Sequence, residues 1–336
     1  MWDTDTLAEE ASLGKDFIAT ITGRFPRNPP LYFKMRRDRI LAKAVKTPED
    51  YDDLAVASER LGDSLAAIKW INKKPHGGPE VEYRTHANRG TFLVHAYLKG
   101  KLGRSAAEKG LQELETAVKI NPDAHFGRER VQIRLVKEFL DPSDYFEADE
   151  DKLKGAEGYA GIVRLGSGWE SPDVFLAMAV DLAAYRYTRP RMGAIAALAV
   201  LRAHELESSD HKAHLNVMDQ MLEGGQSQDL ESNTKAEYIR LRADANAWQA
   251  RRTAFMEERL KLGRHPDTDP TFWKGWVDGP RPEIHHDWIL DTFGRPVAWY
   301  VLLLGLLIAG SCAAVPLTGL FLLGRAIWRW AKLRKS

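Results

Sequence analysis

The sequence is nearly free of cysteine, since Cys312 is the only one among its 336 residues. A single cysteine excludes a disulfide within the chain, a zinc site made of cysteines and a C-x-x-C-H haem attachment. Charge of one sign is also lacking, because 48 Lys and Arg residues stand against 47 Asp and Glu residues. Without a net basic field, nothing favours nucleic acid or an anionic membrane surface as a partner.

Motifs that carry known chemistry are lacking as well. The chain contains no H-E-x-x-H, no G-x-S-x-G and no G-K-[ST] phosphate loop. The acidic segment from Asp141 to Gly158 lacks the spacing of a calcium loop, and we predict a solvated connection there. The histidine pairs have no clustered third and fourth ligand in sequence, which makes a metal-dependent hydrolase the weakest alternative. These pairs are His211 with His214 and His285 with His286. We predict no catalytic residue, no cofactor, no bound metal and no enzyme activity.

One long apolar run is present, from Val297 to Leu323, and it contains no charged residue. At about 1.5 Å of rise per residue, such a helix is long enough to cross a hydrocarbon core of roughly 30 Å. We therefore predict a transmembrane helix at 297–323, followed by a tail at 324–336 that carries five basic residues. The positive-inside bias places this tail in the cytoplasm and the large domain on the other side.

Export of that domain requires a signal. The opening residues MWDTDTLAEEAS have neither a basic n-region nor an apolar h-region. We expect that a signal has been removed or is not part of this sequence. The alternative is a tail-anchored chain with its domain in the cytoplasm.

The part before the apolar run has a helical pattern and no strand pattern of any length, which predicts an all-α fold. Two helix starts are well marked, at Thr47-Pro48 and at Ser171-Pro172. Each combines a hydroxyl N-cap, a proline at the first helical position and acids in the first turn. The other expected helices include about Thr6–Thr22, Leu31–Val45, His211–Leu222 and about Lys235–Leu262.

The segment YDDLAVASERLGDSLAAIKWINKK carries small and apolar residues at a recognisable spacing. These residues are Tyr51, Leu54, Ala55, Leu61, Gly62, Asp63, Ala67, Ile68 and Trp70. Small residues on both helices allow close approach, and Leu-Gly closes the turn between them. The stretch resembles a tetratricopeptide repeat closely. A single hairpin of this kind cannot bury both of its faces, so it requires neighbours.

Neighbouring hairpins are present in the sequence. A first helix around Gly90 is followed by GLQELETAVKINPDA, although the connection KGKLGRSAAEK is longer than is usual for this family. VQIRLVKEFL looks like half of a third repeat. RPRMGAIAALAVLRAHEL again matches the second helix of a repeat. The resemblance implies a short right-handed solenoid of paired helices.

The N-terminal residues carry a second resemblance. WDTDTLAEEA followed by GRFPRNPPLYFKMRRDR is similar to the opening of a group of uncharacterised exported bacterial tetratricopeptide proteins. In that group a cysteine commonly stands just before the Trp-Asp-x-Asp-Thr-Leu segment, and here Met1 occupies that position. This resemblance implies export and no particular activity.

The predicted domain organisation follows from these elements. It comprises an N-terminal helical cap at 1–47, a repeat domain at 48–262, a juxtamembrane linker rich in Pro, Gly and Trp at 263–296, the transmembrane helix at 297–323 and the basic tail at 324–336.

In tetratricopeptide solenoids the first helix of each pair lines a concave groove. The resemblance implies that the exposed groove positions here are Asp52, Val56, Glu59, Arg60, Arg84, Thr91 and His95. Their mixed charges suit a peptide or protein more than a nucleic acid. We therefore predict a membrane-anchored scaffold for protein–protein interaction on the outer, periplasmic face of a bacterial membrane.

The main alternative is an accessory subunit of a membrane enzyme or transport complex. In that case the apolar helix would pack against other helices through the small residues Gly310 and Ala314.

Overall fold

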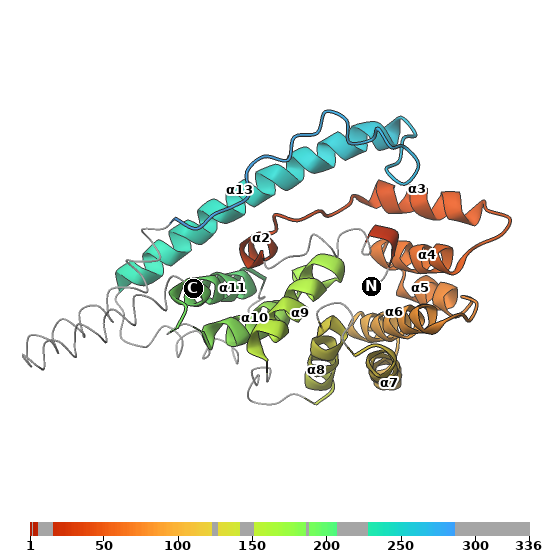
Figure 1. Ribbon diagram of the computed structural model, residues 1–336, viewed down its shortest axis with the longest axis horizontal. Coiled ribbons are helices and arrows are strands. Elements are labelled where there is room, and N and C mark those ends of the chain that lie inside the picture. The colour runs from red at the N-terminus through yellow and green to blue at the C-terminus, as the bar shows by residue number, and fades with distance from the viewer. Residues whose placement is uncertain are drawn as a thin grey trace, which may run out of the picture. The chain divides into compact units, whose positions relative to one another are not determined.

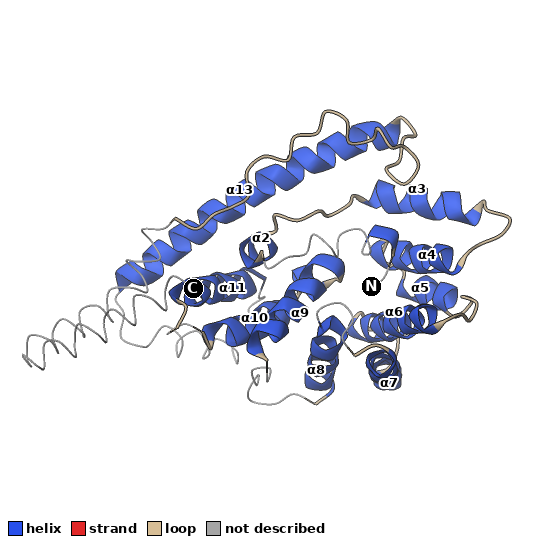
Figure 2. Cartoon of the chain, viewed as in Figure 1, coloured by secondary structure: helices blue, strands red, loops and turns tan. Residues whose placement is uncertain are grey.

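The computed structural model describes residues 1, 3–5, 16–122, 127–141, 151–185, 188–206 and 228–285. All of these belong to the first of two units of the chain, Met1–Ile289. The described residues form helices and contain no strand, which confirms the predicted all-α class (Figures 1 and 2).

Several predictions concern residues beyond that description. The predicted transmembrane helix at 297–323 with its pair Gly310 and Ala314, the basic tail and the predicted helix His211–Leu222 lie outside the described residues. Among the helices that the structure does describe, none has the length and apolar character to cross a membrane.

The described residues contain the following helices in chain order. They are α2 (Phe17–Thr22), α3 (Pro30–Leu41), α4 (Pro48–Arg60), α5 (Ser64–Ile71), α6 (Pro79–Leu98), α7 (Arg104–Ile120), α8 (Arg128–Leu140), α9 (Lys152–Leu165), the short 3₁₀ helix η2 (Gly168–Glu170), α10 (Pro172–Ala183), α11 (Pro190–Leu206) and α13 (Gln228–Lys261).

Both marked helix starts are confirmed. At α4 the Thr47 hydroxyl accepts a hydrogen bond from the Asp50 backbone N–H at 3.3 Å, and the Asp50 carboxylate accepts one from the Thr47 N–H at 3.0 Å. This reciprocal arrangement is a capping box, which satisfies two backbone donors that the first turn leaves open. At α10 the proline occupies the first turn as expected, while the Ser171 side chain makes no capping hydrogen bond.

Small residues bring the predicted hairpins close together. Ala55 on α4 and Ala67 on α5 are fully buried, and Gly62 takes a positive φ of 88° in the turn between these helices. The α6–α7 pair also approaches closely. A Cβ atom built on Gly90 would lie 2.7 Å from the backbone oxygen of Gly110, so both positions require glycine.

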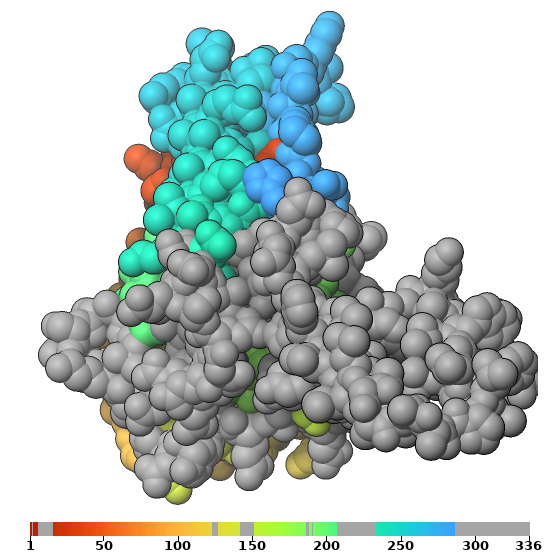
Figure 3. All heavy atoms as spheres, turned by 90° about the vertical axis from the view of Figure 1, so that its left-hand side faces the viewer, coloured from red at the N-terminus to blue at the C-terminus, as the bar shows by residue number. Residues whose placement is uncertain are grey.

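Packing follows the order of the chain. Each helix from α3 to α11 packs on the next helix in sequence, and α13 then returns to contact α2, α3 and α11. The segment 263–285 runs back along α13, as Figures 1 and 3 show from two sides. The Trp248 indole N–H donates to the Asp278 carboxylate at 2.9 Å, and the rings of Phe255 and Trp273 stack at 5.8 Å.

Some predicted boundaries are wrong. α3 ends at Leu41 instead of Val45, and the ammonium of Lys46 donates to the carbonyl oxygens of Leu41 and Lys43 just beyond this end. α7 begins at Arg104, inside the predicted connection KGKLGRSAAEK, so the loop is shorter than the sequence indicates. The Arg104 guanidinium donates to the Leu140 carbonyl at 2.6 Å and ties this start to the end of α8.

Two segments predicted to be connections are partly helical. α9 begins at Lys152 within the acidic segment, where the Asp151 carboxylate accepts a hydrogen bond from the Lys154 backbone N–H at 3.2 Å. An acid at a helix N-terminus is favourable, because its carboxylate accepts from the free backbone N–H groups of the first turn. α13 begins at Gln228, in the interval between the predicted helices His211–Leu222 and about Lys235–Leu262.

Candidate binding pocket

The predicted groove positions are mostly buried, contrary to the exposure expected from the resemblance. Asp52, Val56, Glu59, Arg84 and Thr91 are all buried, His95 is half-buried, and only Arg60 is exposed. Two physical causes account for this difference. Residues at the N-terminal end lie against α4, and ion pairs with neighbouring elements cover most of the remaining side chains.

N-terminal residues cover part of α4. The side chain of Met1 shares a buried cluster with Val56 of α4 and Phe92 of α6. The backbone N–H of Thr4 donates to the Asp53 carboxylate at 2.9 Å. The carboxylate of Asp5 pairs with the buried guanidinium of Arg36 at 2.8 Å.

A buried ion pair holds α4 to the connection before α6. The Lys74 ammonium lies 2.7 Å from a carboxylate oxygen of Asp52, and the side-chain amide of Asn88 donates to the same carboxylate at 3.1 Å. Burial raises the pKa of Asp52 to about 6, against the stabilising effect of Lys74 on its charged form. Arg84 pairs with Glu49 at 3.1 Å and so joins α6 to the first turn of α4. These charged side chains therefore pair with one another inside the protein and join neighbouring helices.

Glu59 is the buried centre of a second network. Its carboxylate accepts a hydrogen bond from the Lys99 ammonium at 2.5 Å and lies 3.1 Å from Nδ1 of His95. Burial raises the pKa of Glu59, but these two contacts outweigh burial and lower the pKa to about 2. Glu59 is therefore charged at neutral pH, and the contacts join the ends of α4 and α6.

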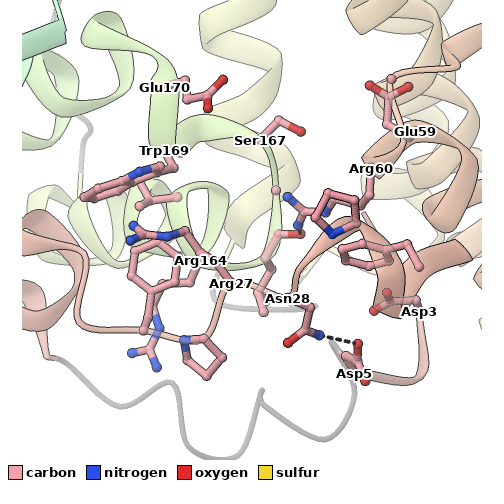
Figure 4. A pocket seen from close by; sticks show the side chains of 18 of the residues that line it. Asp3, Asp5, Arg27, Asn28, Glu59, Arg60, Arg164, Ser167, Trp169 and Glu170 are labelled. Atoms are coloured by element: carbon pink, nitrogen blue, oxygen red, sulfur yellow. Dashed lines mark hydrogen bonds between the residues drawn. The ribbon is translucent and has the colours of Figure 1, made fainter. Parts of the chain in front are cut away.

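A pocket of about 400 Å³ opens beside this network. It lies between the N-terminal residues, the α2–α3 connection, the ends of α4 and α6, and the turn from α9 into η2. Its lining residues are Asp3, Asp5, Phe25, Pro26, Arg27, Asn28, Pro30, Phe33, Glu59, Arg60, Gly62, Lys99, Val163, Arg164, Leu165, Gly166, Ser167, Trp169 and Glu170. Figure 4 shows Trp169 and Glu170 on one side and Glu59, Arg60 and Asp3 on the other. Glu59 and Arg60 of the predicted groove thus belong to the pocket.

Arginines from three elements lie around the indole of Trp169. The guanidinium carbon of Arg202 lies 3.9 Å from the centre of its indole, that of Arg27 lies at 4.6 Å, and that of Arg242 lies at 5.2 Å. The Phe25 ring packs edge-on against the same indole at 5.3 Å. Contacts between a guanidinium and an aromatic face are attractive, most of all where water is excluded.

The segment LGSGW at 165–169 forms the turn from α9 into η2, because Gly166 follows the end of α9 and Trp169 lies in η2. The sequence predicts neither the pocket nor the arginines around Trp169, which come from the α2–α3 connection, α11 and α13. The only signal in the sequence was a tryptophan beside glycines, which does not identify its partners.

Of the two histidine pairs noted in the sequence, the structure describes only His285. His285 lies 3.2 Å from a carboxylate oxygen of Glu237, and His211, His214 and His286 fall outside the described residues. Among the described residues, no three His, Cys, Asp or Glu side chains are placed to hold a metal ion together.

Comparison with known proteins adds no relative. No protein-family model, no curated protein and no solved structure matches the chain. Membership of the tetratricopeptide family therefore stays a prediction from the spacing of small and apolar residues.

Proposed function

We propose that the chain is a tetratricopeptide-like solenoid that binds a peptide segment of a partner protein, anchored to a bacterial membrane by the predicted helix at 297–323. The single observation that supports binding is the pocket of about 400 Å³, which two predicted groove residues, Glu59 and Arg60, help to line. This volume lies in the range of ligand sites and suits a few residues of an extended chain.

The composition of the pocket favours a peptide. Its walls combine apolar side chains such as Phe25 and Leu165 with charged groups of both signs. A peptide presents the same mixture, with apolar side chains beside charged and polar groups. The exposed guanidinium of Arg60 donates to the Leu165 carbonyl at 3.3 Å and lies at the pocket wall, where a partner can reach it.

The proposed location follows from the charge of the predicted tail at 324–336 and from the N-terminal resemblance. A scaffold held at the bilayer raises the local concentration of a partner bound to the same membrane. We propose that the large domain acts on the periplasmic side.

The test uses the full-length chain in its native membrane with a photoreactive residue at position 167, because Ser167 is exposed and lines the pocket. The matched control carries the same residue at position 45, since Val45 is 84% exposed and is not part of the pocket. We expect discrete crosslinked proteins from position 167 only. Arg60→Glu should reduce their yield. The same products from both positions, or none from position 167, would contradict peptide binding in this pocket.

A further inference from the structure

We propose that the pocket binds a carboxylate group of its peptide, and that the guanidinium of Arg27 is the donor that recognises it. This inference rests on the proposed peptide binding and adds the chemical class of the group that the pocket selects.

Arg27 differs from the other arginines around Trp169 in having no acidic partner. Arg202 and Arg242 both pair with Glu205, at 3.1 Å and 2.8 Å. For Arg27 no carboxylate of the described residues lies within ion-pair distance, and its buried Nη1 has no hydrogen-bond partner among them. Nη1 is too deeply buried for a ligand to reach it, but Arg27 lines the pocket, so an anion bound there would supply the opposite charge that the guanidinium lacks.

The charges around Arg27 also favour a bound anion. Burial, followed by repulsion from Arg242 and Arg202, lowers the pKa of Arg27 to about 10, and the attraction of Glu170 offsets only part of this shift. The side chain therefore stays charged at neutral pH, yet its charged form is less stable than it would be in water. A bound anion would remove part of that cost, so ligand binding and the charge of Arg27 favour each other.

The fold holds the Arg27 guanidinium in place. Its carbon lies 4.6 Å from the centre of the Trp169 indole and 5.3 Å from the centre of the Phe25 ring. Gly23 makes room for this arrangement, because a Cβ atom there would lie 2.9 Å from Nη1 of Arg27 and 2.6 Å from the indole. The guanidinium is planar and matches a planar carboxylate, and its contacts with the two rings fix the orientation of that plane.

A carboxylate fits the rest of the pocket better than a doubly charged phosphate. The acids that line the pocket would repel a second negative charge; they are Asp3, Asp5, Glu59 and Glu170. The apolar walls at Phe25, Phe33 and Leu165 suit the organic part of a peptide next to its carboxylate. The carboxylate can be a free chain end or an Asp or Glu side chain, and the experiment separates these two sources.

The experiment measures binding of three pools of N-acetylated random heptapeptides to the full-length chain by equilibrium dialysis and mass spectrometry. The first pool has free C-termini and no acidic residue. The second has the same sequences with amidated C-termini. The third is amidated and contains one Asp or Glu per peptide.

The variant Arg27→Gln removes the proposed donor, and Arg24→Gln is its matched control. Arg24 lies in the same connection and also stacks on a tryptophan, at 4.1 Å from the Trp248 ring centre, but it does not line the pocket. We expect the wild type and Arg24→Gln to bind the first or third pool about tenfold or more tightly than the second. In Arg27→Gln this preference should disappear.

Preference for the first pool identifies a chain end, and preference for the third identifies an acidic side chain. Equal binding of all three pools to the wild type would overturn the carboxylate site while leaving peptide binding intact. This comparison needs no variant, so it holds even if Arg27→Gln folds poorly. A preference that survives in folded Arg27→Gln would overturn the role of Arg27. If no pool binds the wild type and position 167 yields no crosslinked protein, the proposed function itself is wrong.

Discussion

The contact between α6 and α7 allows a sharp test of the helix packing, through the variant Gly90→Ala. A Cβ atom at position 90 would lie 2.7 Å from the Gly110 backbone oxygen and 2.8 Å from Cγ of Leu114. Ordinary van der Waals contact begins at 3.4 Å, so the two helices would have to separate by about 0.7 Å, the difference between 3.4 and 2.7 Å. The clashing oxygen belongs to backbone on the facing helix and cannot rotate away.

Two effects of opposite sign decide the magnitude. Alanine in a helix interior is more favourable than glycine by about 1 kcal/mol. Overpacking a close contact costs typically about 1–3 kcal/mol, and a backbone clash places Gly90→Ala near the upper end of that range. We expect a net loss of about 2 kcal/mol in the free energy of unfolding.

The matched control is Gly161→Ala, which makes the same change inside α9. The nearest atoms to a Cβ atom there are in the Arg128 side chain at 3.6 Å, so the added methyl group has room. We expect this variant to gain about 0.5–1 kcal/mol. Urea unfolding of the full-length chain, followed by circular dichroism, measures both variants. A gain in Gly90→Ala equal to that in Gly161→Ala would refute the close α6–α7 contact.

Three further predictions concern buried charges. Arg36→Met should lower the free energy of unfolding by about 3 kcal/mol, because the variant leaves Asp5 and Asp267 without the cation that now lies 2.8 and 2.6 Å from them; an unchanged urea midpoint would contradict this. Burial raises the pKa of Glu59, but its hydrogen bonds outweigh burial and lower the pKa to about 2 in the folded protein. The free energy of unfolding of the wild type should therefore fall as the pH drops from about 4.5 toward 2. Glu59→Gln should flatten this part of the pH profile. Asp53 should have the opposite effect on the pH dependence of stability. Burial raises its pKa to about 7, although Arg36 opposes the shift, so stability should fall as the pH rises from about 4 to 7. Urea midpoints across this range should show that decline in the wild type and a smaller decline in Asp53→Asn, where Asp52 with its raised pKa of about 6 still contributes; an undiminished decline in the variant would count against the assignment.

Local sequence determined most of the helices. The start of α4 follows from Thr47 and Pro48 alone, because the capping groups and the backbone they satisfy lie within one turn. The close approach of the hairpins could also be predicted, since small residues such as Ala55 and Ala67 recur at the spacing of facing helices. These features depend on neighbours in the sequence or on the adjacent helix, and a repeating pattern therefore reveals them.

Only the tertiary structure decided which charged residues are buried and which are exposed at the pocket. Glu59 and Arg60 are adjacent on α4, yet the first is buried against Lys99 and the second is exposed beside the pocket. The surroundings of Trp169 could not be predicted either, because Arg27 and Arg242 reach it from elements far apart in the sequence. Burial and charge depend on contacts between distant segments, and a pattern within one segment carries no information about them.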